Sequence, residues 1–291
     1  MRLLALQTVL VAIDDAEGAV PVIETAHRLS AAAGAALHVV HVEPDATLRR
    51  PAEPARTPGS FPWLDGVLRD AGVAATHVTV HVMRGDPARA IGVLADRIHA
   101  GVIVLGPHAE PKDGSGDRLL GNTALAVVTN ASAPCLLVIG RLRLPLERVV
   151  VPIDVSDTAR GALLVGLSWA SALRARSATG GGDGRTTTLT IVHVGKGSSA
   201  LDNELNEARR AAGNWAGLTI VGETISGSDV ARAIAAHAVE HEADLVVLGT
   251  RGLGLDPIGR LGSVSAAVTR QVRTPVLLVP PAVWIAHAPS R

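Results

Sequence analysis

The chain of 291 residues is long enough for about two domains, and 47% of them are hydrophobic, which excludes a disordered chain. Its 27 basic residues balance 27 acidic ones, so no net charge favours nucleic acid or an anionic membrane surface. The single cysteine, Cys135, excludes an intramolecular disulfide and a cysteine-cluster metal site.

The first predicted element is a strand at residues 7–14, QTVLVAID. The N-terminus as a whole, MRLLALQTVLVAIDD, resembles a weak secretion signal, because one arginine is followed by apolar residues. It lacks a small-residue cleavage site before Asp14 and Asp15. A similar segment, ERVVVPID, occupies residues 147–154 inside the chain. We therefore predict a strand rather than a signal, and a cytoplasmic protein, because no apolar run reaches the length of a membrane span.

Five segments of the first half recur in the same order in the second half. The offset runs from 140 (residue 147 against 7) to 152 (residue 189 against 37). LHVVHV at 37–42 returns as LTIVHV at 189–194, VIVLG at 102–106 as LVVLG at 245–249, and APCLLV at 133–138 as TPVLLV at 274–279. Such self-similarity predicts two copies of one unit. We place the first domain at residues 1–140 and the second at 146–291.

Short apolar runs alternate with helix-like segments in each copy. In the second copy the predicted strands are 148–153, 188–194, 216–222, 244–249 and 275–279, and the predicted helices are 157–175, 199–212, 228–242 and 263–272. Nearly continuous apolar strands suit a parallel sheet that is buried on both faces. The fold class is therefore α/β, with two tandem doubly wound, Rossmann-like domains, each with a five-stranded, mainly parallel sheet. Residues 43–62 and 178–188 are predicted loops.

The glycine-rich stretch at residues 249–265, GTRGLGLDPIGRLGSVS, connects the fourth strand of this copy to its last helix. Ligands of doubly wound sheets bind at the carboxyl ends of strands, and a helix N-terminus attracts phosphate. Gly249 and Gly252 allow unusual turns, and Arg251 and Arg260 supply cations. The alternative is an ordinary turn in which Ser263 caps the helix. A dinucleotide fingerprint fails, because Pro257 stands at the position of its third glycine.

The spacing Gly249-x2-Gly252-x9-Gly262-Ser263 resembles the ATP-binding motif of the universal stress protein family. VPID at 151–154, His193-Val194 and PVLLV at 275–279 resemble other marks of that family. The resemblance implies a fold like that of the adenine nucleotide alpha hydrolases, a role in survival under stress, and ATP as ligand, with any Mg²⁺ or Mn²⁺ held mainly by its phosphates. The implied binding residues are Pro152, Ile153, Asp154, Val194, Gly249, Arg251, Gly252, Gly262, Ser263, Val264 and Ser265.

Two roles are open for Asp154 at this stage. The resemblance implies that it contacts the nucleoside, whereas its place just before a helix is also typical of an N-cap.

The matching loop of the first copy, residues 106–122, departs from the motif. Ala109 replaces the second glycine, eleven residues separate it from Gly121, and Asn122 replaces the serine. Three acidic residues add charge that repels phosphate: Glu110, Asp113 and Asp117. We predict that the first copy binds ATP weakly or not at all.

His237-Ala-Val-Glu-His241 matches a zinc-protease pattern, but the first copy has Leu94 and Ile98 at the two histidine positions, and the sequence reveals no third ligand. This favours a helix face packed on the sheet. Four histidines on strands of the first copy show no ligand pattern either: His38, His41, His77 and His81. We predict neither a protein-held metal nor a Ser-His-Asp triad.

Together these features predict a nucleotide-dependent regulatory module with its working site in the C-terminal domain and with weak ATP hydrolysis at most. The alternatives are a slow metal-dependent ATPase and an interaction protein that has lost the nucleotide. The resemblance further implies that the last strands pair the two halves as a pseudo-dimer, and two such chains are expected to form a homo-oligomer. No nucleic acid or membrane is expected as a partner.

Overall fold

The computed structural model describes residues 6–14, 18–45, 47, 51, 62–106, 120–154, 156–173, 186–195, 199–213, 215, 217–252 and 261–283. Within these ranges, no helix combines the length and the apolar character that crossing a membrane requires. The predicted loop at 43–62 lies mostly outside the described residues, as do most of the loop at 178–188 and most of the first-copy loop at 106–122.

The first half alternates strands and helices in the predicted way. Its elements are β1 (Thr8–Ile13), α1 (Ala19–Ala33), β2 (Ala36–Pro44), α2 (Pro62–Asp70), a short 3₁₀ helix (Ala75–His77), β3 (Thr79–Gly85), α3 (Pro87–Arg97), β4 (Val102–Leu105), α4 (Asn122–Asn130) and β5 (Cys135–Leu137).

The second half repeats this order. Its elements are β6 (Arg148–Pro152), α5 (Asp157–Ala172), β7 (Thr187–Val194), α6 (Ser199–Ala212), β8 (Leu218–Ile225), α7 (Val230–Glu240), β9 (Leu245–Gly249), α8 (Ser263–Gln271) and β10 (Val276–Val279). Most bounds agree with the predicted ones within two or three residues. The largest shift among the strands is in β8, which begins two residues and ends three residues later than the predicted 216–222.

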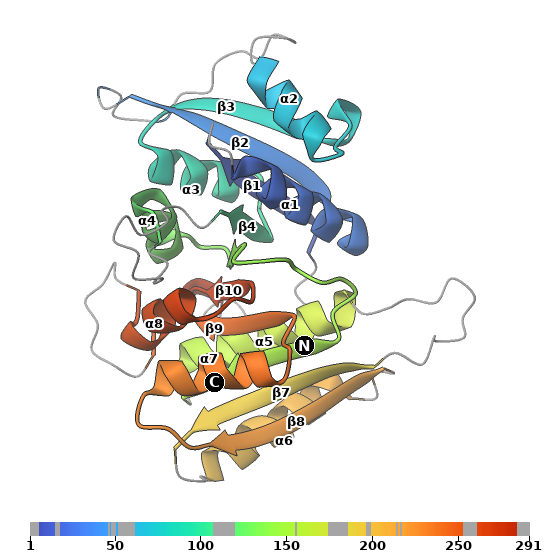
Figure 1. The fold of residues 1–291 in the computed structure, drawn as a ribbon, viewed down its shortest axis with the longest axis vertical. Helices are drawn as coiled ribbons and strands as arrows, with labels where there is room; N and C mark the ends of the chain where they lie inside the picture. Colours follow the sequence, from blue (N-terminus) through green and yellow to red (C-terminus); the bar gives the residue numbers. More distant parts are fainter. Residues whose placement is uncertain are drawn as a thin grey trace.

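All ten strands join one sheet in the order β3-β2-β1-β4-β5-β10-β9-β6-β7-β8, which places β3 and β8 at opposite ends of the molecule (Figure 1). Pairing is parallel within each half. The halves meet where β5 and β10 pair antiparallel, with Leu136 opposite Leu277. The fold class is confirmed, and the two five-stranded sheets are continuous through their last strands.

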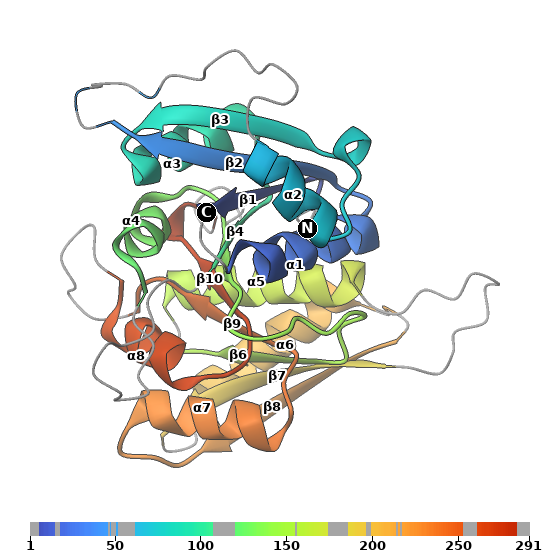
Figure 2. The same ribbon diagram turned by 45° about the horizontal axis from the view of Figure 1, so that its top comes forward.

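Helices cover both faces of this sheet (Figure 2). Each face has its own apolar layer. Helices α1, α2, α5 and α6 pack on one face, whereas α3, α4, α7 and α8 pack on the other. Alternate strand residues serve opposite layers: Val9 and Val11 face the first, and Leu10 faces the second. Both layers run through the two halves, so the halves share their core.

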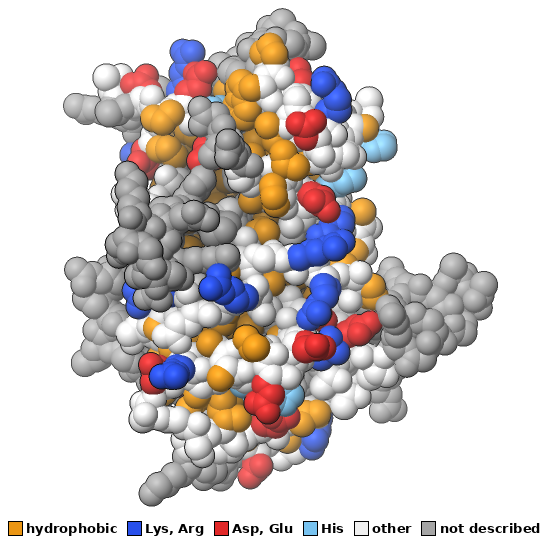
Figure 3. All heavy atoms as spheres, in the orientation of Figure 1, with side chains coloured by type: hydrophobic (Ala, Val, Ile, Leu, Met, Phe, Trp, Pro, Cys, Tyr) orange, Lys and Arg blue, Asp and Glu red, His pale blue; other side chains and the backbone are white. Residues whose placement is uncertain are grey.

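Cys135 lies in the second layer at 1% exposure. Burial raises the pKa of its thiol to about 12, so this cysteine acts as a small apolar side chain. On the face seen in Figure 3, basic and acidic side chains are interspersed, and neither sign forms a broad region.

Candidate functional site

A cavity of about 280 Å³ opens beyond the carboxyl ends of β6, β7 and β9, next to the start of α8. Strand order reverses here, because β6 has β7 on one side and β9 on the other, and such a switch point is where doubly wound folds bind ligands. Every residue predicted for the site lines this cavity: Pro152, Ile153, Asp154, Val194, Gly249, Arg251, Gly252, Gly262, Ser263, Val264 and Ser265.

The structure adds lining residues that the sequence reasoning missed as site residues: Ala159, Val192, His193, Val230, Ile234 and Leu248. Five of the six are apolar and belong to helices or strands, so they give the cavity an apolar lining. The nearly continuous apolar runs predicted buried strands, to which Val192 and Leu248 belong. These runs carried no signal that the residues border a cavity.

Gly249 ends β9 where this strand passes close to the first turn of α5. A Cβ on Gly249 would lie 2.8 Å from Thr158 Cγ2 and 3.0 Å from the Thr158 carbonyl carbon and oxygen. Glycine is therefore required by lack of space. Gly249 and Gly252 are both absent from the described glycines with positive φ, so the interpretation that they supply unusual turns is wrong.

Gly252 lies against the carboxylate of Asp154. A Cβ on Gly252 would lie 2.5 Å from Asp154 Oδ2, so any larger residue would displace either the loop or the carboxylate. Asp154 Oδ1 accepts hydrogen bonds from the backbone N–H of Ser156 at 3.1 Å and from its hydroxyl at 2.6 Å. Ser156, and not Asp154, is the N-cap of α5, since its Oγ accepts the N–H of Ala159 at 3.2 Å. Asp154 thus holds the cap in place and presents Oδ2 toward Gly252.

The start of α8 exposes backbone N–H groups to the cavity. Gly262 is its N-cap, with φ −56° and ψ 146°, and no side chain of the described residues caps the helix. Ser263 is the first helical residue and is exposed, so the interpretation of Ser263 as the cap is wrong. Uncapped N–H groups and the positive end of the helix dipole together favour an anion here.

Ser265 has a structural role as well. Its Oγ–H donates to the carbonyl oxygen of Gly249 at 2.7 Å and is buried. This bond fixes the first turn of α8 to the end of β9, which keeps the helix start aimed at the cavity.

The other end of the cavity lies between β6 and β7. The Ile153 N–H donates to the Val192 carbonyl at 2.8 Å, and His193 Nδ1 lies 3.4 Å from the Ile153 carbonyl oxygen. His41 and Ile13 make the same contact in the first half, at 3.3 Å. Because both copies make this contact, the histidine has a structural role that does not depend on the glycine motif. Arg251 is half-buried on the cavity wall, and Arg260 lies outside the described residues.

The first half repeats the helix start without the rest of the motif. Gly121 is the N-cap of α4, with φ −58° and ψ 154°, and within the described ranges no side chain caps this helix either. Its loop residues Ala109, Glu110, Asp113 and Asp117 lie outside the described part of the chain.

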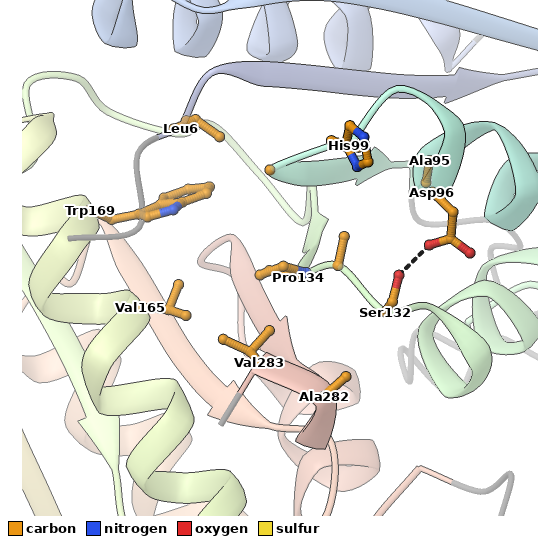
Figure 4. Close-up of a pocket in the computed structure, with 13 residues that line it drawn as sticks. Leu6, Ala95, Asp96, His99, Ser132, Pro134, Val165, Trp169, Ala282 and Val283 are labelled. Atoms are coloured by element: carbon orange, nitrogen blue, oxygen red, sulfur yellow. Dashed lines mark hydrogen bonds between the residues drawn. The ribbon is translucent and has the colours of Figure 1, made fainter. Parts of the chain in front are cut away.

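A second cavity, of about 520 Å³, lies where the two halves meet (Figure 4). Its wall is largely apolar, with Trp169 and Val165 from α5 and Val283 beyond β10. Two of its polar side chains satisfy each other, since Ser132 Oγ donates to the carboxylate of Asp96, and His99 lines the cavity as well. The described lining of this larger cavity includes neither an arginine nor the start of α8, the two features that make the first cavity suitable for an anionic ligand.

Comparisons with known proteins agree with the architecture. A model of the universal stress protein family matches residues 5–138 and again 145–280. The crystal structure of a universal stress protein from Archaeoglobus fulgidus DSM 4304 is 20% identical, with a TM-score of 0.63, and the match covers 95% of this chain and 98% of that one. A putative universal stress protein from Pseudomonas aeruginosa UCBPP-PA14 is 19% identical, with a TM-score of 0.61, over 98% of this chain and 97% of that one.

A shorter solved structure, of a universal stress protein in complex with cAMP, is 29% identical over 47% of this chain and 98% of its own, with a TM-score of 0.36. No curated protein sequence matches the chain.

Proposed function

Because the chain belongs to the universal stress protein family, we propose that it is an ATP-binding regulatory module whose working site is the cavity of its second half. The observation that carries the proposal is one cavity that combines the motif glycines, an uncapped helix start and an arginine at the switch point of the sheet.

The cavity fits the parts of a nucleotide in order. Val192, Ile234 and Leu248 offer an apolar wall for a base, and the Asp154 carboxylate offers an acceptor for a sugar hydroxyl. The volume of about 280 Å³ lies near the lower end of ordinary ligand pockets, so the base and sugar would be enclosed while the phosphates extend along the loop. The space that a Cβ would fill at Gly252 is then available to phosphate oxygens.

The start of α8 would bind the phosphates through backbone N–H groups from Ser263 onward, and Arg251 would add a charged donor. A Mg²⁺ or Mn²⁺ ion would be held mainly by phosphate oxygens and water, as such hard cations usually are. It would neutralise phosphate charge, while the residues of this chain bind and orient the nucleotide.

The role is regulatory rather than catalytic in this proposal, because Asp154 is the one carboxylate among the described lining residues and its Oδ1 is engaged by Ser156. A slow ATPase is the second candidate, since Asp154 Oδ2 faces the cavity near Gly252. A single-turnover assay with Mg²⁺ separates the two. We expect no hydrolysis above the rate without protein, whereas hydrolysis that Asp154→Asn abolishes would favour the ATPase.

The binding test uses the repeat as its own control. ATP at a hundredfold excess over Kd should stabilise the protein by about 2.7 kcal/mol and raise its Tm, and calorimetry should give one ATP per chain. Gly262→Glu adds a negative side chain at the start of α8 and should abolish both effects. Gly121→Glu makes the same change at the start of α4 and should leave them intact.

Three results would contradict parts of this proposal. An unchanged Tm with ATP favours the interaction protein that has lost its nucleotide. Binding of two equivalent ATP molecules per chain would refute the prediction that the first copy binds ATP weakly or not at all. Full ATP binding by Gly262→Glu refutes the placement of the phosphates.

We further propose a cytoplasmic protein that forms a dimer of tandem chains. The β5–β10 pair occupies the last strands within one chain, so association between chains would use other surfaces. Light scattering on the purified protein measures the mass of the particle in solution, which distinguishes a dimer from a single chain.

A further inference from the structure

Three potential metal ligands from two elements come together in the second half, outside the residues that line the nucleotide cavity. They are Glu223 on β8, His237 on α7 and His241 at the end of α7, and one ligand atom from each lies within 4.8 Å of the other two. We infer that these side chains bind a divalent transition metal ion, with Zn²⁺ as the best fit.

His237 is the buried member of this cluster. Its side chain is 5% exposed, and its buried Nε2 atom has no hydrogen-bond partner in the part of the chain that the structure describes. Burying a polar nitrogen without a partner costs free energy, which coordination of a metal ion would recover. The Glu223 Oε2 atom is 3.8 Å from this nitrogen, and the ring of His241 is 4.0 Å from the ring of His237, between centroids.

His241 is already oriented as a metal ligand. Its Nδ1 lies 3.0 Å from the carbonyl oxygen of His237. Because a carbonyl only accepts, Nδ1 must carry the proton in this bond, and the neutral ring then has its lone pair on Nε2. Histidine ligands commonly donate their second N–H to a backbone carbonyl in this way.

Glu223 supplies the ligand that sequence reasoning did not identify. It lies 14 residues before His237 (237 − 223) and pairs with Val192 in the register of β7 and β8. The carboxylate that joins the two histidines comes from the neighbouring strand and not from Glu240 of the His-x-x-Glu-His pattern. That contact depends on how β8 lies against α7, which local spacing does not reveal.

The first half shows that the fold does not require this cluster. The strand register places His81 opposite Val40, as Glu223 lies opposite Val192, and Leu94 and Ile98 stand at the two helix positions. Two of these three residues cannot bind a metal. Apolar packing of α3 on the sheet is therefore sufficient for the fold, and the ligand set is a property of the second half alone.

Two imidazole nitrogens and one carboxylate oxygen are the ligand set of open zinc sites, which leave a fourth position for water. Ligand atoms around a tetrahedral Zn²⁺ lie roughly 3.4 Å apart, given bonds of about 2.0–2.1 Å. The side chain of Glu223 is partly exposed and can rotate toward the histidines. His237 is fixed by burial, and the exposed His241 is held by its bond to the His237 carbonyl. Mg²⁺ prefers oxygen ligands, so this site is distinct from a nucleotide-bound cation.

A bound ion would join α7 to β8 beside the nucleotide cavity. Ile234, one helical turn before His237, lines that cavity, and so does Val192, the neighbour of Glu223 in the sheet. Zinc binding itself does not depend on a nucleotide, so the test is done without one.

The experiment starts from full-length protein freed of metals with a chelator. Titration with Zn²⁺ should give one saturable site per chain, and Co²⁺ at the same site should give the visible absorption of tetrahedral coordination. The variants His237→Leu and His241→Ile copy residues that the first half accepts, and Glu223→Gln changes a partly exposed side chain. Each variant should weaken Zn²⁺ binding at least tenfold, and the double histidine variant should abolish the Co²⁺ spectrum.

His77→Gln is the control, because His77 is an exposed histidine of the first half, and we expect unchanged Zn²⁺ affinity. Circular dichroism verifies that each variant is folded. Absence of saturable Zn²⁺ binding by the parent protein would overturn the inference, as would full affinity in the double variant. Loss of binding in His38→Gln would also overturn it, because the metal would then belong to the His38–His81 pair, whose Nδ1 and Nε2 atoms are 2.9 Å apart.

Discussion

At the scale of single residues, Gly252 is the motif glycine that lies against a charged side chain of the candidate site. A methyl group at Gly252 would lie 2.5 Å from Asp154 Oδ2, so Gly252→Ala must displace the carboxylate or the loop. We expect about a tenfold loss of ATP affinity, or ~1.4 kcal/mol, with little change in Tm without ligand. Calorimetric titration measures the affinity for ATP, and thermal unfolding without ligand measures the Tm.

The control for this substitution is Gly92→Ala on α3, where a Cβ meets nothing within 4 Å. It should leave ATP affinity unchanged and stabilise the helix by about 0.5–1 kcal/mol. Unchanged affinity in Gly252→Ala would show that the phosphates do not approach this glycine.

His38 gives the protein a specific pH dependence. Burial lowers the pKa of His38, and the nearby His81 lowers it further. The unfolded chain therefore takes up a proton at a higher pH than the folded one. The contribution of His38 to the free energy of unfolding is fully present above pH 6.5, the ordinary pKa of histidine. It is lost as the pH falls from there through the lower pKa of the folded protein.

The repeat again suggests the test variant, since Thr190 stands at the position of His38 in the second half. His38→Thr should lose less stability between pH 7 and pH 5 than the parent protein, as measured by urea unfolding at each pH. An equal loss in both proteins would show that His38 does not contribute to acid sensitivity.

At the scale of elements, Asp244 joins the starts of β9 and β6. It is 3% exposed, and its Oδ2 accepts the backbone N–H groups of Glu147 at 2.9 Å and Arg148 at 2.8 Å. Its Oδ1 accepts from Arg143 Nε at 2.6 Å. Asp244→Ala leaves these donors without their acceptor, and we expect a loss of about 3 kcal/mol in the free energy of unfolding.

An exposed ion pair nearby provides the comparison. Glu242 is 70% exposed at its side chain and lies 3.1 Å from Arg148 Nη2. Glu242→Gln should cost under about 1 kcal/mol, because water screens such pairs. Chemical denaturation of both variants measures the difference, and equal losses would contradict the role assigned to the buried carboxylate.

The elements also show which parts of the fold can be predicted from sequence. β6, β7, β9 and β10 are apolar runs buried on both faces, and their predicted bounds agree with the structure within one residue. β8 has only one neighbouring strand and several half-exposed residues, so its apolar signal is weak and its predicted range is displaced. An edge strand is defined by its partner more than by its own sequence.

The candidate site likewise contains residues that the sequence predicts and residues that it does not. The motif glycines and Ser263 are predictable because their spacing is local. Val192 and Ile234 are not, since a buried apolar residue has the same sequence pattern whether it faces a core or a cavity. The contact of Glu223 with His237 depends on the register of an edge strand against a helix, which is a tertiary property.

At the scale of the whole molecule, the two halves are parts of one structure. The antiparallel β5–β10 pair completes a single ten-stranded sheet, and each apolar layer contains residues of both halves. Pairing through the last strands was expected from the resemblance, and the structure contains it within one chain. A change at this junction should therefore affect the stability of both halves together.

Gly140, just after β5, is the residue that tests this coupling. Its φ is +101°, and a Cβ there would run into the carbonyl oxygen of Arg273 in the second half. Gly140→Ala should therefore cost about 1–3 kcal/mol and lower the Tm. Gly72→Ala is the control, with φ +70° and no atom within 4 Å of a Cβ, so it bears the backbone cost alone. Because the halves share sheet and core, calorimetry should show one transition that shifts as a whole; two transitions, of which only one moves, would mean that the halves unfold independently.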